Sequence, residues 1–115
     1  MKSVDALLEE ADVFMEQGEE KITVNQNAGY QEFQHAVANM LKAYLINNRQ
    51  EPLGDLKALF FQCQKHNSEF EFIEYVMEIF TDTEPGELDG ETITDAANEI
   101  WDFVMEKFPA MEDGV

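Results

Sequence analysis

The spacing of the apolar residues constrains the fold of this chain more than any other feature of the sequence. Large apolar side chains recur three and four positions apart along nearly the whole chain, and strict alternation is almost absent. Spacings of three and four place side chains on one face of an α-helix, whereas alternation would indicate β-strands. The pattern therefore predicts an all-α protein, an up-and-down bundle of four to five helices.

Turn and cap residues divide the first half of this pattern into three predicted helices. The first covers about 3–21 with Ser3 as its N-cap. The second covers about 28–48 after a turn in which Asn25 and Asn27 can act as caps. Pro52 separates the second helix from a third, because a proline restricts the residue before it to extended angles. The third helix should face the core with Leu53, Leu56, Leu59, Phe60 and Cys63.

Two further helices are predicted in the second half. Ser68 followed by Glu71 has the spacing of a capping box, which marks the start of the fourth helix. A loop rich in acidic residues and glycine follows. Thr92 with Asp95 three positions later then predicts the cap of a last helix, which ends before Pro109.

Length and composition indicate one domain. The chain has 115 residues, of which 44% are hydrophobic, including nine Phe and six Met, and this is enough for one core but not for two. We therefore expect a single helical domain over 1–109, followed by a flexible acidic tail over 110–115.

The charge of the chain excludes several classes of function. It carries 25 acidic and 7 basic residues, a net charge of −18. Residues 1–57 contain ten acidic and five basic residues, and residues 58–115 contain fifteen acidic and two basic residues. Binding to DNA depends on Lys and Arg, so direct DNA binding is disfavoured, as is an anionic membrane surface. The N-terminus lacks the basic and apolar regions of a secretory signal, which predicts a cytoplasmic protein. An acidic surface of this kind suits a basic protein partner.

The sequence does not point to a metal or cofactor. Cys63 and His66 are three positions apart on a predicted helix, but the chain has no second Cys, and His35 is its only other His. The acidic loop at 81–91 fails the register of an EF-hand, because the required glycine position is occupied by Glu87. No phosphate-binding glycine motif or nucleophile motif is present. We predict no metal and no cofactor.

Three segments of the chain together resemble a HEPN domain. The first, at 28–46, is an Ala-rich helix ending in Leu-Lys-Ala. The second, at 52–59, is a Pro followed by a short Asp-Leu helix start. The third, at 92–104, is an acidic cap before an Ala-rich amphipathic stretch. The resemblance spans about residues 3–108. It implies a helical bundle, commonly dimeric, that often works beside a small nucleotidyltransferase in prokaryotes.

The chain departs from that family where its ribonuclease members carry an Arg followed, after four to six residues, by a His. Its only arginine is Arg49, and Gly54, Asp55 and Leu56 occupy the positions where that His would fall. RNA cleavage thus lacks the groups that would stabilise the transition state and move a proton. The resemblance therefore implies a non-catalytic relative of these enzymes.

These observations lead to the hypothesis of a non-catalytic, HEPN-like binding or regulatory protein. Pairs of large apolar residues, such as Phe60 beside Phe61 and Phe70 near Phe72, widen the apolar stripes beyond what a small bundle must cover and predict a homodimer. Its partner would be a nucleotidyltransferase or another basic protein. The polar residues predicted to contact a partner or ligand are Gln34, His35, Asn47, Asn48 and Arg49.

Two alternatives from other classes stay open. The first is a hydrolase or ribonuclease-type enzyme whose carboxylates hold a divalent metal. The second is an acidic mimic of nucleic acid, in which rows of carboxylates imitate phosphates.

Overall fold

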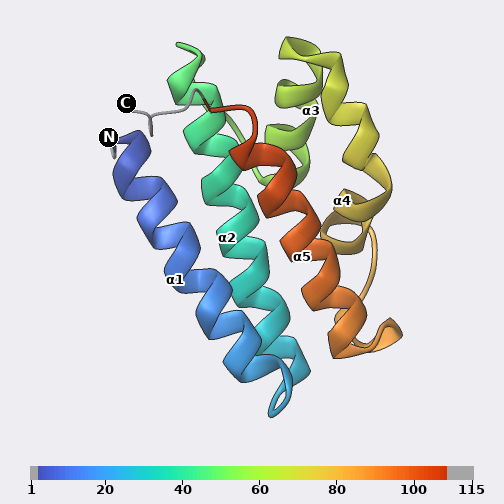
Figure 1. Ribbon diagram of the computed structural model, residues 1–115. Helices are drawn as coiled ribbons and strands as arrows, with labels where there is room; N and C mark the ends of the chain where they lie inside the picture. The colour runs from blue at the N-terminus through green and yellow to red at the C-terminus, as the bar shows by residue number, and fades with distance from the viewer. Residues whose placement is uncertain (1–2, 109–115) are drawn as a thin grey trace.

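The computed structural model describes residues 3–108, and its elements confirm the all-α prediction. Within that range the chain forms five α-helices and two short 3₁₀ helices, with no strand (Figure 1). The α-helices are α1 (Val4–Ile22), α2 (Gln26–Asn47), α3 (Leu56–His66), α4 (Glu74–Thr81) and α5 (Gly90–Met105), and the 3₁₀ helices are η1 (Ser68–Ile73) and η2 (Pro85–Glu87). The predicted tail at 110–115 lies outside the described residues.

The helices α1 and α2 form an antiparallel hairpin, for which the predicted caps Ser3 and Asn25 are confirmed. Asn27 is not a cap, because α2 begins at Gln26 and includes it. The Ser3 hydroxyl and the Asn25 side-chain carbonyl each accept a hydrogen bond from the backbone N–H three residues later, at 3.1 Å in both cases. Each bond satisfies one of the N–H groups that a helix start leaves without a partner. The turn between the two helices is therefore only a few residues long.

Two glycines allow the backbones of α1 and α2 to lie close together. A Cβ atom at Gly18 would lie 2.8 Å from the ring of Phe33, and one at Gly29 would lie 2.6 Å from the backbone of Ile22. Both distances are shorter than a van der Waals contact. The hairpin therefore depends on residues without a side chain at these two positions.

The helix α3 runs parallel to α2, so one step of the up-and-down alternation is skipped. The thiol of Cys63 lies 4.0 Å from the carbonyl oxygen of Leu41, and three residues further along both helices His66 is hydrogen-bonded to the Tyr44 hydroxyl at 3.1 Å. The connecting segment 48–55 makes this possible by returning along the molecule before α3 begins (Figure 1).

Two helix starts differ from the prediction. Ser68 does not cap an α-helix. Instead, Asn67 caps η1 by accepting a hydrogen bond from the N–H two residues later at 3.0 Å, and α4 begins only at Glu74. Thr92 is not the cap of α5 either, because the Asp89 carboxylate accepts the bond from the Thr92 N–H at 2.7 Å.

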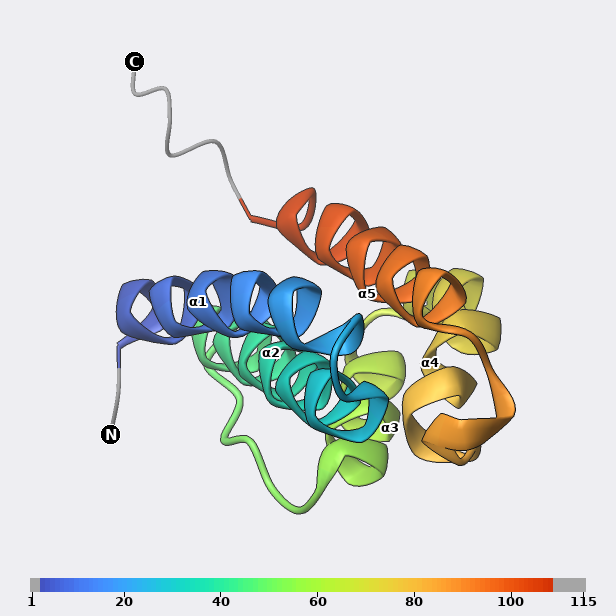
Figure 2. The ribbon, with the colours of Figure 1, turned by 90° about the horizontal axis from the view of Figure 1, so that it is seen from below.

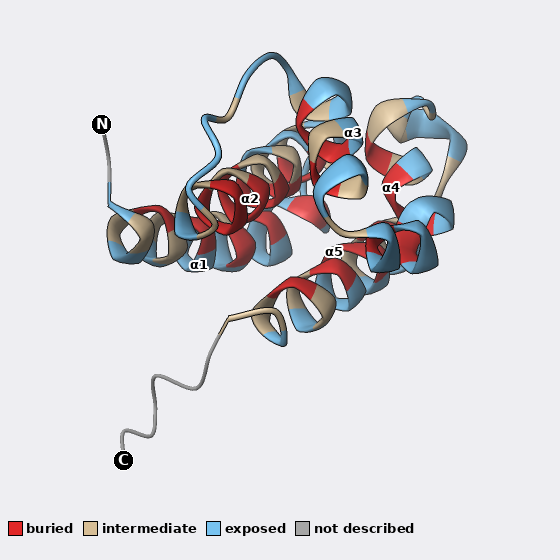
Figure 3. Ribbon diagram, turned by 90° about the horizontal axis from the view of Figure 1, so that it is seen from above, coloured by how far each residue is buried: buried red, intermediate tan, exposed pale blue. Residues whose placement is uncertain are grey.

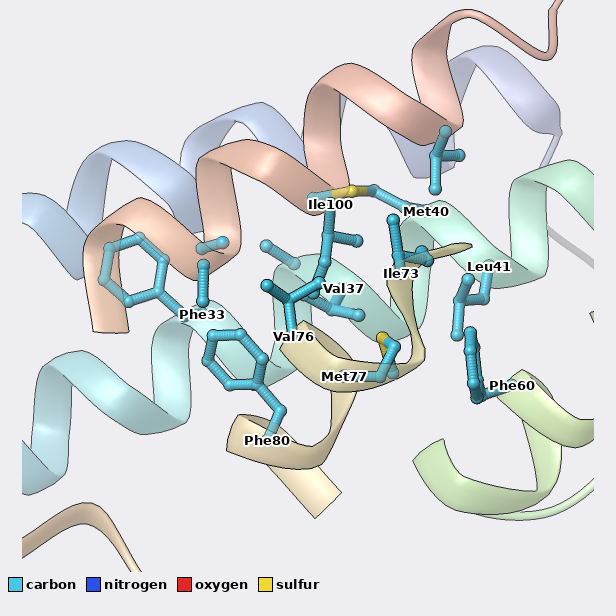
Figure 4. Close-up of a cluster of buried hydrophobic side chains, with 14 of the residues drawn as sticks. Phe33, Val37, Met40, Leu41, Phe60, Ile73, Val76, Met77, Phe80 and Ile100 are labelled. Carbon is cyan, nitrogen blue, oxygen red and sulfur yellow. The ribbon is translucent and has the colours of Figure 1, made fainter. Parts of the chain in front are cut away.

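The core surrounds α2, which the other helices cover on most sides (Figures 2 and 3). Phe33, Val37, Met40 and Leu41 of α2 are fully buried against side chains from the surrounding helices (Figure 4). The prediction that Leu53 faces the core is wrong. Its side chain is 60% exposed, because the chain is still extended there and α3 begins only after it. In the described part of the chain, no helix is long and apolar enough to cross a membrane.

Candidate interaction surface

Two of the residues predicted to contact a partner, Gln34 and His35, are adjacent on α2 but differ in their surroundings. The side-chain amide of Gln34 donates a hydrogen bond to the carbonyl oxygen of Phe80 at 2.9 Å and so joins α2 to α4. His35 is exposed and packs edge-on against the ring of Phe14, with 5.3 Å between the centroids. Gln34 therefore serves the packing of the bundle, whereas His35 remains at the surface.

The other predicted contact residues lie at the far end of the same helix. Asn47 is exposed, and the side-chain amide of Asn48 donates to the carbonyl oxygen of Tyr44 at 2.8 Å. The 13 residues from Gln34 to Asn47 correspond to about 20 Å along a helix. The structure thus does not bring the five predicted residues together in one site.

Arg49 has a structural role that the sequence did not indicate. Its φ angle of 63° lies in the left-handed region. Its N–H donates to the carbonyl of Ile46 at 3.0 Å, and the N–H of Gln50 donates to that of Leu45 at 2.8 Å. This pair of bonds is the Schellman motif, which closes the C-terminal end of a helix and most often uses glycine at this position.

The Cys63 and His66 pair is part of the packing between α2 and α3. Burial raises the pKa of the Cys63 thiol to about 12, because the thiolate would lose its hydration. His66 bonds to the Tyr44 hydroxyl, as described above. Within residues 3–108, no three His, Cys, Asp or Glu side chains are grouped so that they could share a metal.

Carboxylates of the loop between α4 and α5 take part in hydrogen bonds within the protein. The hydrogen bonds with Thr92, first of all that from its backbone N–H, keep the pKa of Asp89 below its usual value. The pKa of Asp82 is also lowered, first of all by its hydrogen bond from Lys57, which forms an ion pair with it at 3.0 Å. On α2, Gln26 donates from its side-chain amide to two carbonyl oxygens of this loop.

The surface between α1 and α5 combines an acidic stripe with two hollows. The two helices run antiparallel, and each is packed more extensively on α2 than on the other (Figures 1 and 2). A hollow of about 570 Å³ lies where α1 ends and α5 begins, and one of about 400 Å³ lies where α1 begins and Trp101 projects from α5. We call this surface the acidic seam; it comprises Asp5, Leu8, Glu9, Asp12, Glu16 and Glu19 of α1 and Glu91, Asp95 and Trp101 of α5.

The carboxylates of α1 in the acidic seam form one continuous row. Asp5, Glu9, Asp12, Glu16 and Glu19 follow one another at steps of four, three, four and three, and all five are exposed. This spacing keeps them on one face of a helix. None of the five has an ion pair or side-chain hydrogen bond among the described residues, and no Lys or Arg lines either hollow.

The acidic seam also exposes apolar surface beside these charges. Trp101, the only tryptophan of the chain, and Leu8 are both half-buried and line the same hollow. An aromatic side chain that is half-covered in a hollow and flanked by polar groups is typical of a protein interface. Charge and apolar surface therefore lie together on this face.

A further hollow, of about 220 Å³, lies between α3 and α4, and the charge of its lining is mixed. Its lining includes the Lys57–Asp82 ion pair and Phe61, which is 61% exposed and has the ammonium group of Lys65 at 5.5 Å from its ring centroid. Phe72 and Tyr75 on η1 and α4 are also largely exposed. The lining of this hollow thus contains a cation, Lys57, whereas the two hollows of the acidic seam have none.

The row on α1 is visible in the sequence as acidic residues at alternating steps of four and three, although most of the net negative charge belongs to residues 58–115. Only the fold places α1 next to α5 and adds Trp101 to the surface.

No family model, curated protein or solved structure matches the chain.

Proposed function

We propose that this protein is a non-catalytic, HEPN-like binding or regulatory protein that associates with a basic protein partner through the acidic seam. The observation that carries the proposal is the row of five exposed carboxylates on α1, which has no cation beside it among the described residues. A partner with Lys and Arg side chains would relieve the mutual repulsion of these groups and gain charge complementarity.

The sequence around Arg49 supports a role without RNA cleavage. It is the only arginine of the chain, and its backbone closes the end of α2 in a left-handed conformation. The segment that follows it has no His at the spacing of the ribonuclease motif. A binding role requires only a stable helix end at this position.

The HEPN resemblance suggests a nucleotidyltransferase as the first partner to test, and a homodimer as the binding unit. We place the contact between the two copies on the α3 and α4 side, where Phe61, Phe72 and Tyr75 are exposed. The acidic seam suits this contact less well, because two copies would bring the same carboxylates together.

Purification of the tagged protein from its native cells at low salt tests the proposal. Mass spectrometry should identify a basic partner that is released as salt rises, since exposed charges are screened over about 10 Å at 0.1 M salt. The variant E9Q/D12N/E16Q should recover much less of this partner. The matched control E51Q/E84Q/E87Q changes the net charge equally and should recover as much as the wild type. Its positions are exposed and lie outside both the acidic seam and the proposed dimer contact, and glutamine keeps a side-chain oxygen that can accept the cap hydrogen bonds of residues 84 and 87.

Two outcomes would contradict the proposal. Recovery of no protein besides the chain itself would argue against a stable partner. Equal losses in the two triple variants would mean that total charge, and not the acidic seam, determines binding.

Mimicry of nucleic acid is a second candidate, favoured by the same row of carboxylates. It differs in the kind of partner, which would be a protein that also binds DNA or RNA. If the recovered partner releases this protein when duplex DNA is added, mimicry explains the acidic seam better than regulation does.

A further inference from the structure

The acidic seam has a repeat that restricts the shape of what can bind to it. From Asp5 to Glu19 its five carboxylates extend over 14 residues of helix, about 21 Å at 1.5 Å per residue. In an extended strand, residues on one face recur about every 6.7 Å, so five of them would span about 27 Å and lose register. A second helix with basic residues at steps of three and four has the same repeat as α1 and stays in register.

The apolar part of the acidic seam adds a second requirement. Trp101 and Leu8 lie in the hollow next to the first carboxylates of the row, on its α5 side. A partner that offered only charge would leave these side chains partly in water. A partner helix with large apolar side chains next to its basic residues would cover Trp101 and Leu8, and its Lys or Arg side chains would reach the carboxylates of α1.

From this geometry we infer that the acidic seam binds a basic amphipathic helix, an inference that rests on the proposed association with a basic partner. The basic residues of that helix face the row on α1, and its apolar face covers Trp101 and Leu8. A second copy of this chain does not fit the site. Its own α1 carries seven acidic residues and one lysine and would place like charges opposite each other.

The fluorescence of Trp101 provides a direct test, because this is the only tryptophan in the chain and it lies in the proposed site. The probe is a synthetic peptide of about 20 Lys and Leu residues, without Trp or Tyr, whose sequence is amphipathic as a helix and which would span about 30 Å. Its control is a peptide of the same composition, scrambled to remove the apolar face. Both are titrated into the full-length protein at low salt.

The amphipathic peptide should shift the Trp101 emission to shorter wavelengths and reach saturation, because it covers the indole. The scrambled peptide should bind about tenfold more weakly or not at all. E9Q/D12N/E16Q should weaken binding of the amphipathic peptide by about tenfold, since three exposed charge pairs are lost. E51Q/E84Q/E87Q should leave its binding unchanged. Circular dichroism checks that both variants remain helical.

Each other outcome overturns a distinct part of the inference. Equal binding of the two peptides would reject the helix but keep a basic partner. Binding by calorimetry without a change in Trp101 emission would place the peptide elsewhere. Absence of binding by either peptide would contradict both the inference and the proposed function. An emission shift that follows protein concentration alone, with dimers in sedimentation, would mean that a second copy covers Trp101.

Discussion

At the scale of single residues, Gly29 marks the close contact between the start of α2 and the end of α1. Alanine normally stabilises a helix interior relative to glycine by up to about 1 kcal/mol. Here the added methyl group would lie 2.6 Å from the backbone of Ile22, which cannot move aside as a side chain can. We therefore expect Gly29→Ala to lower the free energy of unfolding by about 1–3 kcal/mol in urea denaturation.

Gly86 offers the matched control, because a Cβ atom there would have no heavy atom within 4 Å. Gly86→Ala should change the stability by less than about 0.5 kcal/mol. If the two substitutions had equal effects, the close approach of α1 and α2 at Gly29 would be refuted.

Arg49 leads to a prediction of the opposite sign. A residue with a Cβ atom is held there at a φ angle of 63°, which costs about 1–2 kcal/mol relative to glycine. Arg49→Gly should therefore raise the thermal midpoint, whereas the β-branched Arg49→Val should lower it. Recovery of the basic partner should be the same for Arg49→Gly and the wild type. Loss of the partner with a stable fold would instead show that the arginine side chain makes the contact.

The sequence suggested Gln34, Asn48 and Arg49 as contact residues because polar side chains on a central helix resemble a binding surface. The structure assigns Gln34 and Asn48 to carbonyl groups of the bundle, at Phe80 and Tyr44. Which carbonyl oxygen a polar side chain can reach depends on how the helices end and pack. A pattern of residue types does not contain that information.

At the scale of helices, the row of carboxylates on α1 should reduce its stability. Its members repel one another at spacings of three and four, where each like-charged pair costs about 0.2–0.5 kcal/mol. E9Q/D12N/E16Q breaks all four of these contacts and should raise the free energy of unfolding by about 1 kcal/mol at low ionic strength.

Salt provides the check on this prediction. The gain measured for E9Q/D12N/E16Q should shrink as sodium chloride is added, because salt screens the repulsion in the wild type. A gain that stays constant up to 1 M salt would indicate a change in packing and not in charge.

The existence of the helices could be predicted, but not all of their starts. Apolar spacing reflects burial, and burial extends over whole helices, so the pattern is repeated many times. A helix start depends on one side chain. Near η1 and α5 several residues could serve as caps, and Asn67 and Asp89 do so because of how the chain enters each helix.

At the scale of the whole molecule, the net charge of −18 should make the protein more stable as salt rises. Self-repulsion of a highly charged chain weakens its compact state. Sodium chloride should raise the thermal midpoint gradually over hundreds of millimolar. Magnesium, manganese or calcium should add nothing beyond their contribution to ionic strength. A saturable rise at micromolar metal would instead support the alternative of a metal-dependent hydrolase.

The acidic seam depends on where the fold places the charges and not only on their distribution along the chain. Counted along the chain, most of the negative charge belongs to residues 58–115. In the fold, α1 from the first half lies beside α5 from the second, and the row on α1 becomes one wall of the surface. The sequence contains both components, but their proximity depends on how each packs on α2.

The burial of Cys63 has a practical consequence for experiments on this protein. Thiol-directed dyes and spin labels react with the thiolate, which is scarce for a buried thiol with a pKa of about 12. A cysteine introduced on an exposed face, for example at Gln17, should therefore take up a maleimide reagent selectively while the native cysteine stays in place. Distances between α1 and a labelled partner could then be measured without altering the core.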